Sequence, residues 1–161
     1  MILEAPPHLL DTSLRLGVAT LLGLLLGLDR EVRGKPAGLR THALVSMSSA
    51  VTTLVSLEFY HMVRAGEAGD ADPIRVVQGI AQAIGFICAG VIIQGRGPHV
   101  RNLTTAASIW MAGALGIACG GGFYLIAGLA TVLTLVVLVV IGAIEQRLFG
   151  KPLDDQPDAA P

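Results

Sequence analysis

Five apolar runs, each close to the length of a membrane-spanning helix, most constrain what this sequence can fold into. A helix needs about 20 mostly apolar residues to cross a bilayer. The runs occupy residues 9–28, 42–60, 74–94, 103–119 and 123–144. Only 14% of the residues are charged, whereas soluble domains carry about 25%. We therefore predict an all-α, polytopic membrane protein: a bundle of five transmembrane helices over residues 1–144.

The charges between the runs predict the orientation of this bundle. With five crossings, the two termini lie on opposite sides. One side receives eight cations: Arg30, Arg33, Lys35, Arg40, Arg96, Arg101, Arg147 and Lys151. The other side receives three: Arg15, Arg64 and Arg75. Because cytoplasmic loops are enriched in Lys and Arg, we predict that the N-terminus is outside and the C-terminus is cytoplasmic. The charged, Pro-rich residues 145–161 are expected to form a short tail without fixed structure.

Several classes of function are disfavoured. The net charge of −1 argues against nucleic acid as a partner, because phosphate binding needs a surplus of cations. The four histidines (His8, His42, His61 and His99) lack zinc-ligand spacing, and the chain has no P-loop. Cys88 and Cys119 fall inside apolar runs and are interpreted as small buried residues. We expect no enzyme activity and no resident cofactor.

The second run carries a polar stripe. Its members are His42, Ser46, Ser49, Thr53 and Ser56. Their spacings of four, three, four and three residues place them on one helix face. Such a face is expected to meet neighbouring helices or a water-filled path rather than lipid. Alternatively, the hydroxyl groups bond to carbonyl groups of their own helix.

Small residues at helical spacing predict where the helices pack closely. The pairs are Gly23 and Gly27 in the first run, Gly85 and Ala89 in the third, and Ala112 and Gly116 in the fourth. Gln78 and Gln82 share the face of Gly85 and Ala89. Because five helices form a small bundle in the lipid bilayer, we expect a homo-oligomer, namely a dimer.

Charged and polar residues gather at the predicted cytoplasmic mouth of the bundle. They are Asp29, Arg30, Glu31, Arg40, Thr41, Asn102, Thr104 and Thr105. Asp29 can pair with Arg40 or with Arg101. The start of the fourth helix can be capped by Asn102 or Thr104. Either these groups lock the short loops together, or they bind a ligand or partner. Asp29 and Glu31 are the candidate metal ligands. A divalent cation needs oxygens that converge on it. Asp29 and Glu31 are two residues apart, so on a helix their side chains point in different directions.

Three sequence elements resemble the MgtC/SapB family of bacterial membrane proteins. The first is Gly27-Leu-Asp-Arg-Glu with Gly34-Lys-Pro-Ala-Gly-Leu-Arg-Thr-His42. The second is Ile84-Gly-Phe-Ile-Cys-Ala-Gly90, and the third is Val100-Arg-Asn-Leu-Thr-Thr-Ala-Ala107. They follow one another in the family's order, and the resemblance runs from about Leu14 to Ile144.

This resemblance implies a multi-pass protein of the bacterial inner membrane that is linked to growth under magnesium limitation and, in pathogens, to virulence. It implies a regulator of another membrane complex, such as the F-type ATP synthase. A second hypothesis is a small magnesium or cation transporter or channel, with the polar stripe lining the path and Mg²⁺ as its ligand.

The sequence departs from the family pattern in four places and at its end. Asp29 stands where the family usually has Glu, Cys88 and Asn102 each stand in place of Gly, and residues 47–49 replace a stretch rich in Gly and Ala. The C-terminal ACT-like domain of longer members is not expected after Pro161.

Overall fold

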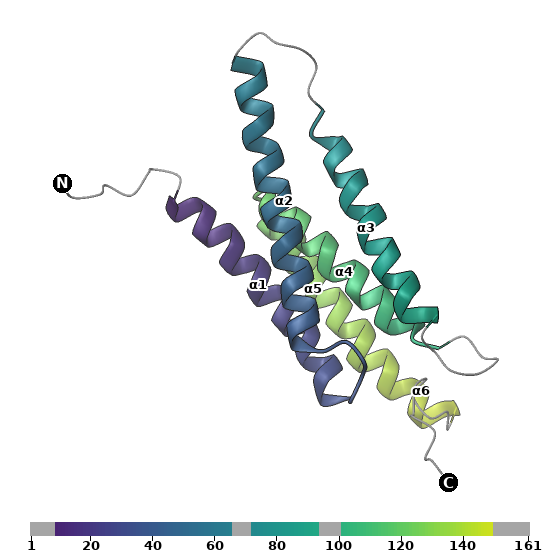
Figure 1. The fold of residues 1–161 in the computed structure, drawn as a ribbon. Coiled ribbons are helices and arrows are strands. Elements are labelled where there is room, and N and C mark those ends of the chain that lie inside the picture. Colours follow the sequence, from purple (N-terminus) through teal and green to yellow (C-terminus); the bar gives the residue numbers. More distant parts are fainter. Residues whose placement is uncertain (1–8, 66–71, 94–100, 150–161) are drawn as a thin grey trace.

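The computed structural model describes residues 9–65, 72–93 and 101–149, and every regular element in these ranges is helical (Figure 1). The elements are α1 (Leu9–Val32), α2 (Leu39–Ala65), α3 (Ile74–Ile93), α4 (Leu103–Gly120), α5 (Tyr124–Leu135), the π-helical segment η1 (Val136–Ile141) and α6 (Gly142–Phe149). Within these ranges, five helical spans are long and apolar enough to cross a membrane, and the fifth joins α5 to η1 and the start of α6. The predicted all-α membrane bundle is confirmed, whereas its orientation stays a prediction.

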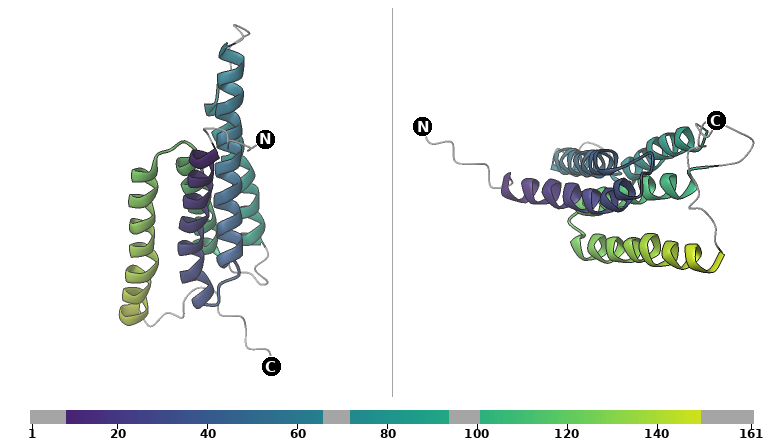
Figure 2. Two further views of the ribbon diagram at one scale, coloured as in Figure 1. Left: turned by 90° about the vertical axis from the view of Figure 1, so that its left-hand side faces the viewer. Right: turned by 90° about the horizontal axis from the view of Figure 1, so that it is seen from below.

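The helices are arranged in layers. Figure 2 shows α1 and α4 between a layer formed by α2 and α3 and a layer formed by α5. The most extensive contacts join α2 to α1 and to α4, whereas α2 and α3 touch only slightly. Of the residues in α5, only Ala127 and Thr131 are buried, as expected for a uniformly apolar helix with much lipid contact.

Glycines bring the backbone of α2 into direct contact with both of its main neighbours. A Cβ atom at Gly23 would lie 2.6 Å from the carbonyl oxygen of His42, and one at Gly27 would lie 2.7 Å from Cα of Leu39. On the other side, a Cβ at Gly116 would overlap the carbonyl oxygen of Ser46. The side chain of Ala112 is fully buried nearby. Four of the six predicted packing residues therefore lie at contacts between helices, where only very small side chains fit.

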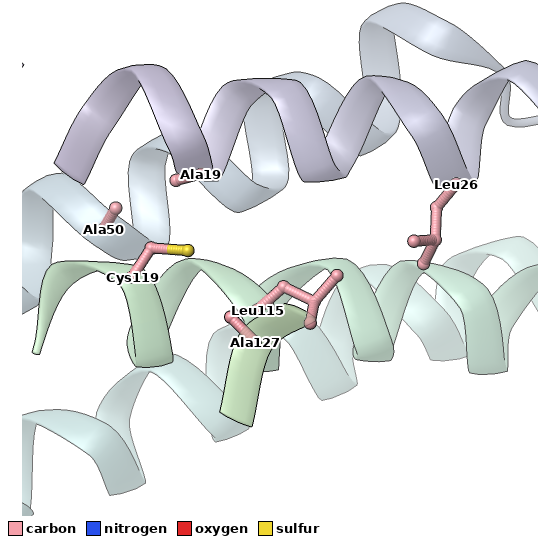
Figure 3. Close-up of a cluster of buried hydrophobic side chains, with 6 residues drawn as sticks. All are labelled: Ala19, Leu26, Ala50, Leu115, Cys119 and Ala127. Atoms are coloured by element: carbon pink, nitrogen blue, oxygen red, sulfur yellow. The ribbon is translucent and has the colours of Figure 1, made fainter. Parts of the chain in front are cut away.

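An apolar cluster fills the space between α1, α4 and α5. Figure 3 shows Ala19 and Leu26 of α1, Leu115 and Cys119 of α4, Ala50 of α2 and Ala127 of α5. Four of these six side chains are Ala or Cys, so the helices approach closely around two leucines. Cys119 is buried and forms no disulfide.

The side of α3 that packs within the chain differs from the predicted packing side. Ile80, Ile84 and Cys88 are the buried residues of α3, and they form one apolar cluster with Ala106 and Ile109 of α4. Gln78, Gln82 and Ala89 are exposed, and Gly85 is half-buried beside Trp110. On the α3 side this contact is formed mainly by Ile80 and Ile84 rather than by the predicted small residues, and Ile84 packs against Gly113 of α4.

Several helices extend past their predicted ends. α1 continues to Val32 and α2 to Ala65, because backbone hydrogen bonds continue the helix into polar sequence. The 27 residues of α2 span about 40 Å, more than the roughly 30 Å of a hydrocarbon layer. At its polar end, Arg64 donates a hydrogen bond to the hydroxyl of Tyr60 over 2.8 Å. Residues 145–149 are helical and correct the prediction of an irregular tail, whereas residues 150–161 lie outside the described part.

Arg15 lies near the start of α1 and joins this helix to the end of α4. Its Nη1 donates to the carbonyl oxygen of Gly120 over 2.8 Å, and its Nε lies 2.7 Å from Oδ2 of Asp11. A cation at a helix C-terminus stabilises the unpaired carbonyl groups there. Asp11 and Arg15 are thus paired one turn apart on α1, and Arg15 holds the α4–α5 turn.

The contact at Gly116 gives a direct test of the packing. We expect Gly116→Ala to lower the free energy of unfolding by about 1–3 kcal/mol, because the added methyl group meets a backbone oxygen that only a helix shift can move. Gly128→Ala is the matched control, since no atom lies within 4 Å of a Cβ at that position. Chemical unfolding of both variants in detergent micelles measures the difference. Equal stabilities would contradict the close contact.

Candidate functional site

The turn between α1 and α2 is built from backbone hydrogen bonds at a glycine. Gly34 has a positive φ of 64°, which glycine adopts without strain. Its N–H donates to the carbonyl of Glu31 over 3.0 Å, and the N–H of Lys35 donates to the carbonyl of Arg30 over 3.0 Å. This pair of bonds is the Schellman ending of a helix. The glycine therefore stops α1 and turns the chain towards α2.

Glu31 supports the start of α2. Its Oε2 accepts a hydrogen bond of 3.1 Å from the backbone N–H of Leu39, the first residue of α2. The carboxylate lies so close to Gly38 that a Cβ there would overlap it. A negative charge at a helix N-terminus is favourable because the first N–H groups of the helix are unpaired.

Arg30 lies inside the bundle. Only 4% of the residue is exposed, and its Nη2 donates to Oγ1 of Thr105 over 2.9 Å. Thr105 is fully buried and belongs to the first turn of α4. A charged hydrogen bond of this kind is stronger than a neutral one, so it joins the end of α1 firmly to the start of α4.

His42 continues this contact from α2. The ring is fully buried, and Nδ1 lies 2.9 Å from the carbonyl oxygen of Gly38. Because a carbonyl only accepts, Nδ1 carries the hydrogen. Nε2 lies 3.0 Å from Oγ of Ser108, and that hydroxyl lies 2.8 Å from the carbonyl oxygen of Thr105. Arg30, His42, Thr105 and Ser108 form what we call the buried polar cluster, with contributions from three helices.

Asp29 pairs differently from the prediction. Its Oδ1 lies 2.8 Å from Nε of Arg33, one helical turn away, whereas Arg40 is exposed at the start of α2. Residues four apart on a helix are neighbours, so Arg33 reaches the carboxylate before a residue on another helix can. The second oxygen, Oδ2, is buried without a hydrogen-bond partner.

Asn102 is the residue before α4, and its side chain joins α4 to α3. Its φ is 64°, and its side chain makes no capping bond, contrary to the predicted cap. Instead, Nδ2 donates to the carbonyl oxygen of Val91 in α3 over 3.0 Å. Asparagine is one of the few residues besides glycine that tolerate this backbone region, which explains how it stands in a position where a glycine was expected.

The remaining mouth residues do not converge on one site. Thr104 is exposed and Thr41 is half-buried. Asp29 and Glu31 face different partners, Arg33 and the N-terminus of α2. Within the described ranges, no three His, Cys, Asp or Glu side chains gather closely enough to hold a metal ion. Within the mouth, a direct hydrogen bond joins Arg30 to Thr105.

The polar stripe of α2 is mostly enclosed. His42, Ser46, Ser49 and Thr53 are buried, and Ser56 is half-buried. Ser46 donates to the carbonyl oxygen of Ala19 in α1 over 2.7 Å, whereas Thr53 donates to Ser49 of its own helix over 2.8 Å. Both interpretations of the stripe therefore apply, each to a different residue.

A groove of about 330 Å³ lies between α2 and α3, and Ser49 of the polar stripe is part of its lining. It is lined by apolar residues of α2 and α3 together with Ser48, Ser49 and Thr52. Ser48 and Thr52 are exposed and donate to carbonyl groups of their own helix. No sequence pattern predicts this groove, because its width depends on how far α3 lies from α2.

Comparison with known proteins identifies the family. The MgtC family profile matches residues 16–147. The chain belongs to the MgtC family. It is 43% identical over 115 residues to "Protein SapB" of Bacillus subtilis (strain 168), covering 71% of this chain and 49% of that protein. It is 38% identical over 138 residues to "Putative magnesium transporter YhiD" of Escherichia coli (strain K12), with coverage of 86% and 64%.

A third relative is "Protein MgtC" of Brucella abortus (strain 2308), 38% identical over 140 residues and covering 87% of this chain and 55% of that protein. The chain thus spans roughly half to two thirds of the length of these relatives. No solved structure matches it significantly. Family membership and the five spans together make it a multi-pass membrane protein of the MgtC family.

The bond between Arg30 and Thr105 predicts unequal effects at two adjacent threonines. Thr105→Val keeps the shape of the side chain but removes the acceptor of a buried guanidinium, so we expect the free energy of unfolding to fall by about 1.5–3 kcal/mol. Thr104→Val is the control, because Thr104 is exposed, and we expect a change within about 0.5 kcal/mol. Chemical unfolding in detergent micelles measures both. A loss at Thr104 as large as that at Thr105 would contradict this assignment.

Proposed function

We propose that this MgtC-family protein of the bacterial inner membrane supports adaptation to low magnesium, and virulence in pathogens, by regulating another membrane complex such as the F-type ATP synthase. In this proposal the protein acts through helix surfaces that contact the complex. It does not carry Mg²⁺ through its own bundle.

The enclosed polar stripe is the observation that carries this proposal. A conducting path needs polar groups that face water and coordinate the ion along its length. In this chain the hydroxyl of Ser46 bonds to the backbone of α1, and that of Thr53 bonds within α2. Direct backbone contacts at Gly23 and Gly116 cover the stripe on the sides of α1 and α4, and Ser49 is its one member that also lines the groove towards α3. The stripe therefore supports packing of the bundle in preference to conduction.

Transport by a small magnesium or cation carrier is the alternative. It is favoured by the name of the Escherichia coli relative, "Putative magnesium transporter YhiD", and by the buried Oδ2 of Asp29, which has no hydrogen-bond partner. An unsatisfied carboxylate oxygen is a suitable ligand for a hard cation. In this alternative α2 moves away from its neighbouring helices, so that the polar stripe lines the path of the ion. Asp29 then lies at the mouth of this path.

Mg²⁺ flux into liposomes distinguishes the two functions. Purified full-length chain is reconstituted around a Mg²⁺-sensitive dye, and we expect uptake no faster than in protein-free liposomes. Asp29→Asn tests the alternative. Glu58→Gln is the matched control, because it removes an exposed acid near the end of α2 that is far from Asp29. Saturable uptake that is lost in Asp29→Asn and kept in Glu58→Gln would overturn the regulatory proposal.

The regulatory activity is measured separately in inverted membrane vesicles. We expect vesicles that contain the protein to hydrolyse ATP through their F-type ATP synthase more slowly than vesicles with an unrelated five-span protein at the same level. Crosslinking followed by pulldown then identifies the subunit in contact. Equal rates of hydrolysis would exclude the ATP synthase as the regulated complex.

A further inference from the structure

Two amide side chains of α3 are uncovered inside a membrane span. Gln78 and Gln82 are exposed, and neither amide makes a hydrogen bond within the described part of the chain. Gln82 is the ninth of the 20 residues of α3. At about 1.5 Å per residue, this position is near the middle of the hydrocarbon layer, where the side chain cannot reach water easily.

These amides share one helix face with two small residues. Gln78, Gln82, Gly85 and Ala89 follow spacings of four, three and four residues, so they lie along one side of α3. We call this side the amide face. It differs from the side of Ile84 and its neighbours that packs on α4, and α3 lies at the edge of the bundle (Figure 1).

The groove towards α2 is on yet another side of α3. Its lining from this helix includes Gly79, Ala83 and Ile87, none of which belongs to the amide face. No other helix of the described chain therefore covers the amides. Polar groups that face lipid without a hydrogen-bond partner are unfavourable, and helices in membranes commonly satisfy them across a helix–helix contact.

We propose that the amide face is the interface of a homodimer in which the glutamines of two copies hydrogen-bond to each other. Two copies inserted in the same orientation are related by a two-fold axis along the membrane normal. Their α3 helices are then parallel, and each residue lies at the depth of its own counterpart. Gln82 of one copy therefore meets Gln82 of the other.

The chemistry of the face suits a second copy. A glutamine amide both donates and accepts, so two identical amides satisfy each other, which two ammonium groups or two carboxylates cannot. From Gln78 to Ala89 the four positions carry no charge, and a charged partner would find no counter-ion there. Ala89 is exposed and small enough to let two helix backbones approach, whereas Gly85 has the ring of Trp110 of its own chain beside it. This interface is independent of whether the protein regulates or transports.

Dilution in lipid measures the dimer directly. Full-length chain labelled with donor or acceptor fluorophores is reconstituted in bilayers, and energy transfer is followed as lipid is added. We expect Gln78→Leu combined with Gln82→Leu to weaken dimerisation by about tenfold or more. Leucine is a good helix former and is stable in lipid, so the variant keeps its fold, which circular dichroism checks.

A matched control is available on α2. Ser48 and Thr52 are also exposed and four residues apart, but each hydroxyl is bonded to its own helix. We expect Ser48→Ala combined with Thr52→Val to leave dimerisation unchanged. A dimer that survives the glutamine substitutions, a dimer that is lost equally in the control, or a wild-type chain that is monomeric at every dilution would overturn the proposal.

Disulfide crosslinking tests the geometry of the interface. In a background with Cys88→Ala and Cys119→Ala, we expect Ala89→Cys to form a covalent dimer on mild oxidation. Ala83→Cys is the control, because Ala83 is exposed on the side of α3 that faces the groove. Crosslinking through position 83 and not through position 89 would place the contact on the wrong side of α3 and overturn the proposed interface.

Discussion

Direct contact between helix backbones is the constraint on which the rest of this structure depends. In a bilayer, lipid tails are as apolar as the helices, so burial alone gives little reason for helices to associate. Association depends instead on close packing and on polar groups that need partners. Gly23 brings α1 against the carbonyl of His42, and Gly116 brings α4 against the carbonyl of Ser46. With α2 held on both sides, lipid is excluded from its polar stripe, and the hydroxyl of Ser46 reaches the backbone of α1.

The charged end of the bundle follows from the same close packing. Because glycines let α2 pack directly against α1 and α4, the side chains of Arg30 and His42 lie inside the bundle, where each needs hydrogen bonds. Thr105 supplies an acceptor to the arginine, and Ser108 meets the histidine. The residues of the first family element thus build a turn and a buried polar cluster. These residues have mainly a structural role, because they fix the position of α4 relative to α1.

The sequence was sufficient to predict the features that depend on one helix at a time. Run length predicted the five spans, and small residues at Gly23 and Gly116 marked close contacts. Several features that depend on which side chains meet were mispredicted. Asp29 pairs with Arg33 rather than with a cation of another helix, because Arg33 is one helical turn away and reaches the carboxylate more easily. Gly34 lies six residues after the end of the first apolar run, so its role as the Schellman ending becomes evident only once α1 is known to continue to Val32.

The third helix shows why a packing face is harder to infer in a membrane than in water. A small or polar face on a membrane helix indicates that something packs there, but the sequence does not specify whether that neighbour belongs to the same chain. Within this chain α3 uses Ile80 and Ile84 to contact α4, and its amides at Gln78 and Gln82 point elsewhere. Since the polar groups of α2 are largely satisfied inside the bundle, recognition by other proteins depends on the outward faces, where the exposed amides of Gln78 and Gln82 need a partner.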